Sequence, residues 1–432
     1  MERFALASLS KWKKSKSRKP LIIQGARQVG KTWLMKTFGK REYEQVAYIN
    51  FESSDSLKSI FQENFDVSRL ITAFQIETGI RIRPENTLII LDEIQEAEKG
   101  ITSLKYFCEN APEYHIMAAG SLLGITMHQK TSFPVGKVDF LTLYPMSFNE
   151  FLLALGQEQL YELLQSNDWP MITSFKAKLI GHLRHYYFIG GMPEVVSSFI
   201  SENDFDKVRS IQKSILIAYE HDFSKHAPAE IVPRIKMLWQ SIPAQLSKEN
   251  KKFIYGAVKQ GGRAKEFELA LAWLTDCGLV HKIERISKAA LPLVAYLDTS
   301  AFKLFTLDVG LLSAMGGLTK QTILQGNTIF NEFKGSLAEQ FVLQHLKIRQ
   351  NVQVYYWSSD TARAELDFVI QNNDRIIPIE VKAEENLKAK SLKSFYEKFN
   401  PSISVRTSMS DYRDDGWLVN APLYAFESFP LA

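Results

Sequence analysis

The chain has 432 residues, of which 45% are hydrophobic and 23% are charged, and its net charge is +4. This length predicts two or three domains, and the composition is normal for a soluble globular protein. The charge is too small to indicate nucleic-acid binding by itself. No apolar run reaches membrane-spanning length and no signal-peptide core follows Met1, so we expect a cytoplasmic protein with no membrane partner. The two cysteines, Cys108 and Cys277, lack metal-like spacing and are expected to be reduced.

Basic residues are dense just before the first expected strand. We predict a solvated, flexible lead-in there, and a contact with a phosphate backbone is the alternative. The residues are Lys11, Lys13, Lys14, Lys16, Arg18 and Lys19.

A complete phosphate-binding pattern, G-x-x-x-x-G-K-[ST], follows this segment. The expected strand Leu21–Ile23 precedes it, and the expected helix Thr32–Phe38 follows it, so the helix N-terminus would face the anion. Lys31 is expected to reach the β- and γ-phosphates of ATP, and the Thr32 hydroxyl to bind Mg²⁺. The predicted nucleotide-binding residues are Gly25, Ala26, Arg27, Gln28, Val29, Gly30, Lys31 and Thr32.

A second expected strand, Thr87–Glu93, ends in two carboxylates. Its four successive apolar residues indicate a strand that is buried on both faces, as in a parallel sheet. Asp92 is predicted to hold Mg²⁺ through water, and Glu93 to polarise the attacking water. A strand that ends in a solvated acidic turn is the alternative.

Further strands are expected at Gln45–Phe51, His115–Ser121 and Val138–Leu143. Strands that alternate with helices predict a doubly wound α/β sheet with its ligand at the carboxyl ends of the strands. Ser121 is the predicted sensor between the γ-phosphate and the lytic water. An ordinary turn at the end of a strand explains it equally well.

Several segments together resemble the bacterial and archaeal AAA-type ATPases that carry a C-terminal domain of unknown function 4143. The resemblance covers essentially the whole chain and implies ATP hydrolysis. Lys137 departs from that family, in which arginine commonly follows Pro-Val-Gly, and this departure puts oligomer-dependent hydrolysis in doubt. The segments are Gly25–Thr32, Leu91–Gln95, Ala119–Ser121, Ser132–Val138, Tyr144–Phe151 and Gly190–Glu194.

Helical patterns replace the strands from about Phe188 onward. Helices are expected at Pro193–Ile200 and Ile211–Phe223, and the segment Ser247–Ile283 resembles a winged helix. Its helix Ala264–Leu274 would be the one to enter a DNA groove. Because Glu266 and Glu268 would repel phosphates, we favour a packing or protein-contact module over DNA reading.

Near the C-terminus, two alternating strands predict a β-hairpin with its turn at Asn373–Asp374. In this register Leu366, Phe368 and Ile370 share one apolar face, and Asp367 lies opposite Glu380 on the other. Two carboxylates on directly opposite residues, whose Cβ atoms lie about 5 Å apart, repel each other, which favours a Mg²⁺ or Mn²⁺ ion between them.

Lys382, on the same face as Glu380, is expected to stabilise developing phosphate charge. Asp-…-Glu-x-Lys resembles the active-site pattern of the PD-(D/E)xK nuclease fold, and Glu339 would supply the glutamate of the preceding helix. The predicted catalytic residues are therefore Asp367, Glu380 and Lys382, and the metal ligands Glu339, Asp367 and Glu380. A solvated face on which Lys382 and Glu365 neutralise the carboxylates is the alternative.

The predicted fold class is α/β in three parts: an AAA-type P-loop ATPase (residues 1–180), a helical and winged-helix-like region (181–315) and a nuclease-like domain (316–432). Two functions remain open. One is an ATPase whose nucleotide state acts on a domain that binds or cleaves DNA or other nucleic acid. The other is a nucleotide-gated switch for a protein partner, and a homo-oligomer is compatible with either.

Overall fold

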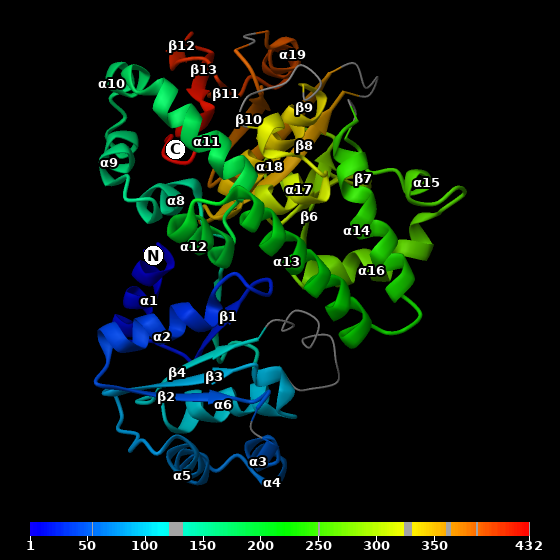
Figure 1. Ribbon diagram of the computed structural model, residues 1–432. Helices are drawn as coiled ribbons and strands as arrows, with labels where there is room; N and C mark the ends of the chain where they lie inside the picture. Colours follow the sequence, from blue (N-terminus) through cyan, green and yellow to red (C-terminus); the bar gives the residue numbers. More distant parts are fainter. Residues whose placement is uncertain are drawn as a thin grey trace. The chain divides into compact units, whose positions relative to one another are not determined.

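The computed structural model describes residues 1–53, 55–120, 133–248, 251–323, 331–359, 364–385 and 388–431. These residues form two compact units. The N-terminal unit comprises Glu2–Tyr144 with Asp276–Leu279, and the C-terminal unit comprises Met1, Pro145–Thr275 and Val280–Ala432. The fold is α/β (Figure 1). The domain boundaries that we predicted at residues 180 and 315 stay predictions.

The N-terminal unit is built on a five-stranded parallel sheet in the order β2-β3-β4-β1-β5. Every residue of β3 and β4 is buried, as expected for strands covered on both faces. The expected strands are confirmed, each within one or two residues at its ends. They are β1 (Leu21–Gln24), β2 (Gln45–Asn50), β3 (Thr87–Asp92), β4 (His115–Ala119) and β5 (Asp139–Thr142).

Helices connect these strands, and helices α5 and α6 pack apolar residues against the sheet. Phe74 and Leu104, for example, lie in one core cluster with Ile89 and Leu91 of β3. The helices of the unit are α1 (Ala5–Lys14), α2 (Lys31–Glu42), α3 (Asp55–Lys58), α4 (Ile60–Glu63), α5 (Val67–Thr78) and α6 (Gly100–Asn110), with a 3₁₀ turn η1 (Ile94–Glu96).

The predicted flexible lead-in is wrong for its first part, because α1 extends to Lys14; residues 15–19 lie outside any helix or strand. Leu6, Leu9 and Trp12 recur at helical spacing and are buried, and this apolar face holds the basic residues in place. Lys13 pairs with Glu42 of α2 at 3.4 Å. Lys11, Lys14 and Lys16 are exposed, so these side chains are solvated as predicted, although Lys11 and Lys14 belong to a helix.

The C-terminal unit is built on an eight-stranded mixed sheet in the order β12-β13-β11-β10-β9-β8-β6-β7. The strands β6 and β7 fall within the region 181–315 that we predicted as helical and winged-helix-like, yet they lie in one sheet with the strands of the predicted nuclease-like region. The strands are β6 (Val280–Ile286), β7 (Leu297–Thr306), β8 (Val352–Ser358), β9 (Glu365–Asn372), β10 (Arg375–Val381), β11 (Ser404–Ser408), β12 (Arg413–Asp414) and β13 (Leu418–Pro422).

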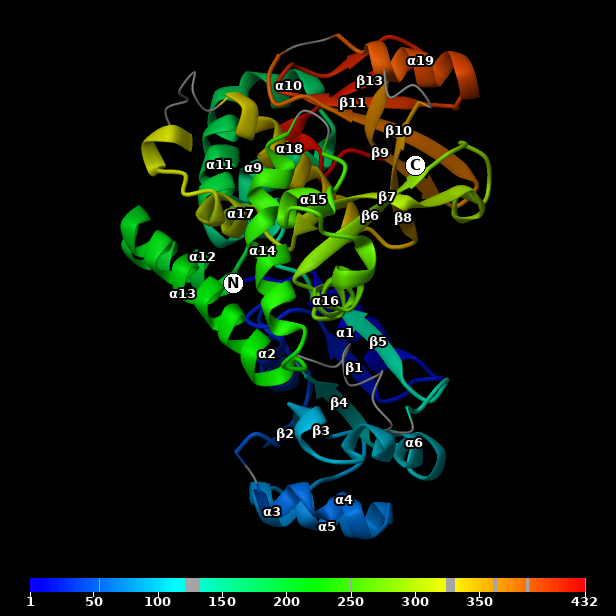
Figure 2. The same cartoon turned by 90° about the vertical axis from the view of Figure 1, so that its right-hand side faces the viewer.

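Two helices contact the centre of this sheet. Helix α18 contacts β8 and β10, and helix α19 contacts β9 and β10 (Figures 1 and 2). The helices of the unit are α8 (Phe148–Ala154), α9 (Glu158–Ser166), α10 (Trp169–Ser174), α11 (Lys176–Ile189), α12 (Pro193–Glu202), α13 (Phe205–His226), α14 (Val232–Leu246), α15 (Tyr255–Val258), α16 (Ala264–Asp276), α17 (Val309–Met315), α18 (Asn331–Lys347) and α19 (Lys390–Phe399), with 3₁₀ turns η2 (Leu293–Tyr296) and η5 (Leu423–Ala425).

The predicted register of the β9–β10 hairpin is confirmed where the two strands pair, with Ile370 opposite Ile377 and Phe368 opposite Ile379. The single apolar face that we drew from it is wrong. The pairing of β8 with β9 shifts between Tyr355 and Trp357. As a result Leu366 packs with Val369 in the cluster beneath α19, whereas Phe368 contacts Phe305 of β7. A bulge of this kind breaks strict alternation and re-aims one side chain.

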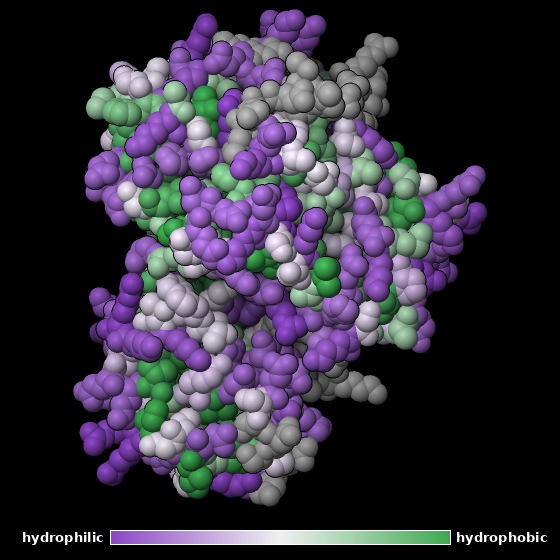
Figure 3. Space-filling view, viewed as in Figure 1, coloured by the Kyte–Doolittle hydropathy of each residue, from purple (hydrophilic) through white to green (hydrophobic). Residues whose placement is uncertain are grey.

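Within the described ranges, no helix is both long enough and apolar enough to cross a membrane. On the face that Figure 3 shows, hydrophobic residues are scattered among hydrophilic ones. Scattered exposed hydrophobic residues are normal for a folded protein in water and do not indicate a docking surface.

Candidate nucleotide site and candidate C-terminal acidic site

The phosphate-binding loop joins β1 to α2 and depends on glycine at two points. Gly25 has a φ of 143°, and a Cβ atom there would lie 2.2 Å from the Leu143 carbonyl oxygen. Gly30 has a φ of 94° and directly precedes α2. Only glycine adopts such conformations without strain, so the loop can curl and direct its N–H groups inward.

Arg3 of the chain's first segment holds this loop from outside the motif. Its guanidinium donates hydrogen bonds to the carbonyl oxygens of Val29 (3.0 Å) and Tyr144 (2.7 Å), and its side chain is buried. Val29 is fully buried as well. Sequence reasoning missed Arg3, because no spacing rule connects it to a loop more than twenty residues away.

Lys31, the lysine of the motif, folds back on its own loop. Its ammonium group donates to the carbonyl oxygens of Gly25 (2.8 Å) and Ala26 (2.9 Å). Burial lowers the pKa of Lys31 to about 8, against the attraction of Glu93 and Asp92. Its partners in the loop are neutral carbonyls, and a charge-assisted hydrogen bond to phosphate is roughly twice as strong as a neutral one.

Thr32 and Asp92 are brought together, as their predicted roles require. The Thr32 hydroxyl donates to the Asp92 carboxylate at 2.7 Å, although the two residues lie on different elements. Tyr48 of β2 donates to the same carboxylate oxygen at 3.0 Å. Sequence reasoning missed Tyr48, since nothing in the local pattern shows that β2 lies beside β3. Hydroxyl and carboxylate oxygens are ligands that Mg²⁺ prefers, so these residues fit that ion.

Glu93 directly follows β3 in a left-handed conformation, with a φ of 49°. Its carboxylate accepts a hydrogen bond of 2.6 Å from the Gln95 side chain, which fixes its direction. A non-glycine residue in this conformation is uncommon and is often found at functional sites. The other catalytic candidate of this site, Ser121, lies outside the described residues.

Three further residues that the sequence singled out have defined surroundings. Gln28 has a φ of 67°, so the loop contains a left-handed residue between its two glycines. Lys137, which stands where the resembling family has arginine, pairs with Glu109 of α6 at 2.9 Å. Arg27 adds a positive charge that acts on Lys31.

In the C-terminal unit, a second group of charges forms what we call the acidic–lysine cluster. The predicted carboxylates all belong to this cluster, and each lies near a lysine ammonium group. Its members are Glu339 of α18, Glu365 and Asp367 of β9, Glu380 of β10, and Lys251, Lys303 and Lys382.

Four ion pairs, made by three lysines, hold this cluster together. Lys303 of β7 is fully buried, and its ammonium lies 2.6 Å from Glu365 and 3.9 Å from Asp367. Lys382 lies 2.9 Å from Glu380, and Lys251 contacts Glu339. Sequence reasoning missed Lys251 and Lys303. They precede the hairpin by more than 60 residues, and only the pairing of strands and helices brings them in.

Asp367 lies at the centre of the cluster. Its carboxylate accepts a hydrogen bond of 2.7 Å from the backbone N–H of Val381, one residue beyond the predicted partner Glu380. Burial raises the pKa of Glu339, and the negative charge of Asp367 adds to that effect. Burial also raises the pKa of Glu380, although Lys382 opposes it. The charge of Asp367 therefore acts on both Glu339 and Glu380, as expected if the three predicted metal ligands lie close together.

The predicted second metal ion does not fit this arrangement. Oε2 of Glu339 and Oε2 of Glu380 are buried and accept no hydrogen bond, so acceptors for a cation exist. However, three ammonium groups already compensate the four carboxylates, and within the described ranges no set of three His, Cys, Asp or Glu residues is placed to hold a metal ion. A divalent ion would have to displace a lysine.

Family models match three parts of the chain. Residues 17–152 match a model described as an AAA domain. Together with the loop, the parallel sheet and the Thr32–Asp92 contact, this match defines the N-terminal unit as an AAA-type P-loop ATPase-like fold. Residues 334–425 match the domain of unknown function DUF4143, which confirms that part of the predicted resemblance. Residues 180–322 match another domain of unknown function, DUF8612.

Solved structures give remote matches. The Walker-type ATPase PABY2304 of Pyrococcus abyssi is 12% identical, with a TM-score of 0.46, over 73% of this chain and 95% of that one. The Orc1 protein of Aeropyrum pernix in complex with DNA is 11% identical (TM-score 0.28; 73% and 93% covered). Cdc6p of Pyrobaculum aerophilum is also 11% identical (TM-score 0.25; 73% and 91% covered). No curated protein matches the chain.

Proposed function

We propose that the chain is a Mg²⁺-dependent ATPase of the AAA type whose nucleotide state controls a nuclease-like C-terminal unit that engages nucleic acid. The observation that carries the ATPase part is the 2.7 Å contact between Thr32 and Asp92, beside a glycine loop whose lysine is buried. Mg-ATP requires oxygen ligands for the metal ion close to backbone N–H groups that bind the phosphates, and Thr32, Asp92 and the loop supply both.

The residues of the loop have distinct tasks in this reaction. The loop N–H groups bind the phosphates, and Lys31 exchanges its bonds with Gly25 and Ala26 for the β- and γ-phosphate oxygens. Thr32 and Asp92 would hold Mg²⁺, which neutralises phosphate charge when bound. Glu93, fixed by Gln95, orients and polarises the water that attacks the γ-phosphate.

The substitution Glu93→Gln tests this assignment. It should keep ATP binding but lower the turnover number by about 100-fold or more, because an amide is a far weaker base. The matched control is Glu96→Gln, an exposed carboxylate three residues further on that should leave turnover unchanged. Unchanged turnover in Glu93→Gln, measured as phosphate release, would remove Glu93 from the reaction.

The nucleic-acid part rests on the assembly of Glu339, Asp367, Glu380 and Lys382 in one cluster, with the residue types that the nuclease resemblance implies. A panel of DNA and RNA substrates with Mg²⁺ or Mn²⁺, in the presence and absence of ATP, tests it. Asp367→Ala should abolish any cleavage. Asp374→Ala, in the exposed turn of the same hairpin, should not.

A second candidate function is a nucleotide-gated switch for a protein partner, in which the nuclease-like unit is inactive. The neutralisation of the acidic–lysine cluster by its own lysines favours it. The two candidates differ in their response to DNA. A nucleic-acid machine should bind DNA with an affinity that falls steeply with salt, and DNA should raise its ATPase rate. A protein switch should show neither effect.

A further inference from the structure

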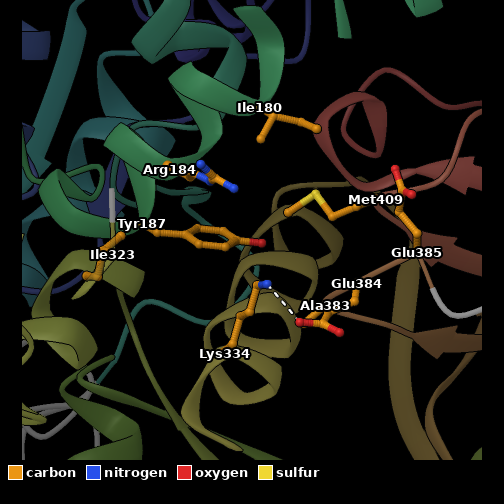
Figure 4. A pocket seen from close by; sticks show the side chains of 9 residues that line it. All are labelled: Ile180, Arg184, Tyr187, Ile323, Lys334, Ala383, Glu384, Glu385 and Met409. Carbon is orange, nitrogen blue, oxygen red and sulfur yellow. Dashed lines mark hydrogen bonds and ion pairs between the residues drawn. The ribbon is translucent and has the colours of Figure 1, made fainter. Parts of the chain in front are cut away.

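A cavity of about 380 Å³ lies in the C-terminal unit and is lined by residues of α11, α18 and the segment that follows β10 (Figure 4). Its lining contains two cations, Arg184 and Lys334, and two carboxylates, Glu384 and Glu385, so it has no net charge. Lys334 pairs with Glu384 at 3.1 Å, and Figure 4 draws this ion pair. The cavity therefore favours neither an anion nor a cation.

In the N-terminal unit, Tyr48 makes a specific contact with an expected metal ligand, and the ATPase reaction proposed above does not use it. Tyr48 belongs to β2, which pairs in parallel with β3, the strand that Asp92 ends. Its hydroxyl donates a hydrogen bond of 3.0 Å to Oδ2 of Asp92. The Thr32 hydroxyl donates to the same oxygen at 2.7 Å. Two hydroxyl donors from different elements therefore converge on one carboxylate oxygen.

These contacts fix the direction of the Asp92 carboxylate. Asp92 is buried, and its other oxygen, Oδ1, accepts a hydrogen bond of 3.2 Å from the backbone N–H of Glu93. Because both oxygens have donors, the plane of the carboxylate is set. An ionised carboxylate has about four acceptor sites, so these donors do not exhaust its capacity for a metal ion or a water that the metal holds.

Tyr48 is itself held from the helix that carries Thr32. The ammonium group of Lys36 lies 3.4 Å from the centre of the Tyr48 ring, which is within the range of a cation–π interaction. Lys36 follows Thr32 by four residues on α2, so the two side chains lie on one face of that helix. Tyr48 thus connects α2, through its ring, to the end of β3, through its hydroxyl.

We propose that Tyr48 is a positioning residue for the Mg²⁺ ion of Mg-ATP, which holds Asp92 so that its carboxylate faces the same metal ion as the Thr32 oxygen. The inference rests on the proposed ATPase function, because it concerns the metal site of that reaction. The Thr32 hydroxyl can donate to Asp92 and offer its oxygen to the metal at once, whereas Tyr48 only holds the carboxylate. Such supporting hydrogen bonds typically account for about 10–100-fold in metal affinity.

The substitution Tyr48→Phe tests the inference, because it keeps the ring beneath Lys36 and removes only the hydroxyl. The affinity of the full chain for a fluorescent ATP analogue is titrated at a series of Mg²⁺ concentrations and again in EDTA. The Mg²⁺ concentration that gives half of the full effect should rise about tenfold. The affinity in EDTA should stay within about twofold of the parent value, since Tyr48 acts on the nucleotide only through the metal.

Tyr43→Phe is the matched control. It removes a tyrosine hydroxyl from the same unit, where that group lies 2.7 Å from a ring nitrogen of His115, and its Mg²⁺ requirement should equal that of the parent. Lys36→Met is a second, independent variant. It removes the cation that holds the Tyr48 ring, and it should raise the Mg²⁺ requirement about threefold.

A higher Mg²⁺ requirement in Tyr48→Phe, with unchanged affinity in EDTA, supports the inference. An unchanged or lower requirement overturns it, because the hydroxyl would then be idle or would compete with the metal for Asp92. An equal loss of affinity with and without Mg²⁺ also overturns it, since the role of Tyr48 would then be structural. If ATP binding by the parent chain does not depend on Mg²⁺, the proposed Mg²⁺ dependence fails together with the inference. If the parent depends on Mg²⁺ and Tyr48→Phe behaves as the parent, the inference fails alone.

Discussion

The phosphate-binding loop and the acidic–lysine cluster both bury charged side chains, but they compensate those charges in opposite ways. Lys31 is bonded to neutral carbonyl oxygens of its own loop. Each carboxylate of the cluster lies near a lysine ammonium. The first site gains energy when an anion replaces a carbonyl as the partner of the lysine. The second must break an ion pair before it accepts an ion.

Of the two sites, the phosphate-binding loop is therefore the one prepared for a ligand. The loop offers its N–H groups to a phosphate, and Lys31 has to exchange only two hydrogen bonds to neutral carbonyl oxygens. In the cluster, four carboxylates and three ammonium groups leave one formal negative charge, so an added divalent ion is attracted only weakly unless a lysine moves away. The following changes would sharpen or break this comparison.

The largest effect is expected for Lys31→Ala. Removing the ammonium deletes the strongest contact to the phosphates, so ATP affinity should fall by about 100-fold or more. Equilibrium titration with a fluorescent ATP analogue measures it. Lys40→Ala, an exposed lysine of the same helix, should leave affinity unchanged. Equal affinity in both variants would mean that Lys31 does not contact the nucleotide.

Lys303→Met should destabilise the C-terminal unit by about 1–3 kcal/mol, because it leaves the partly buried Glu365 and Asp367 without their shared cation. Urea unfolding measures the change. Lys393→Met breaks an exposed pair with Glu397 and should cost less than about 0.5 kcal/mol. A loss below about 1 kcal/mol in Lys303→Met would show that the cluster is not compensated internally.

Lys303→Met also tests whether a metal ion and the Lys303 ammonium group compete for the same position. If Mn²⁺ raises the stability of Lys303→Met but leaves the parent chain unchanged, the metal and the ammonium compete for one position. If Mn²⁺ stabilises both chains equally, the cluster accepts the metal with Lys303 in place, and the contrast between the two sites disappears.

Gly25→Ala should destabilise the N-terminal unit by about 2 kcal/mol, because its φ of 143° and the nearby Leu143 carbonyl leave no room for a methyl group. ATP affinity should fall with it, since the loop must shift. Gly181→Ala adds the same methyl group to a helix, where nothing lies within 4 Å, and should be neutral or slightly stabilising. Thermal unfolding of both variants gives the comparison.

The smallest effect concerns pH. Burial lowers the pKa of His115 to about 4, and the Tyr43 hydroxyl lies 2.7 Å from its ring nitrogen. The folded chain therefore keeps this histidine neutral, whereas the unfolded chain protonates it near pH 6.5. Stability from this group is complete above pH 6.5 and is lost as the pH falls toward 4. The loss at pH 5 should be about 1–2 kcal/mol, relative to His115→Asn. An equal pH profile in both chains would contradict this reading.

Much of the nucleotide site could be predicted from sequence, because its parts are contiguous. Gly25, Gly30 and Lys31 lie within one turn between a strand and a helix, and Asp92 ends a strand whose burial its four apolar residues reveal. The contacts of Tyr48 and Arg3 could not be predicted. They depend on the order of the strands and on the path of the first segment, which local patterns do not contain.

The acidic–lysine cluster shows the limit of the same reasoning. Its carboxylates were predicted from the hairpin and one helix, but its character depends on Lys251 and Lys303. The bulge in β9 also turned Leu366 away from Phe368, which strict alternation cannot predict.

By itself the sequence determined the phosphate-binding loop, the acidic strand end and the identity of the C-terminal carboxylates, because each is a short pattern with a local physical cause. Only the tertiary structure decided what neutralises those carboxylates. Lys303 reaches Glu365 and Asp367 because β7 and β9 belong to one sheet. Ion pairs between distant elements depend on which surfaces pack together, and that is fixed by the burial of the whole core.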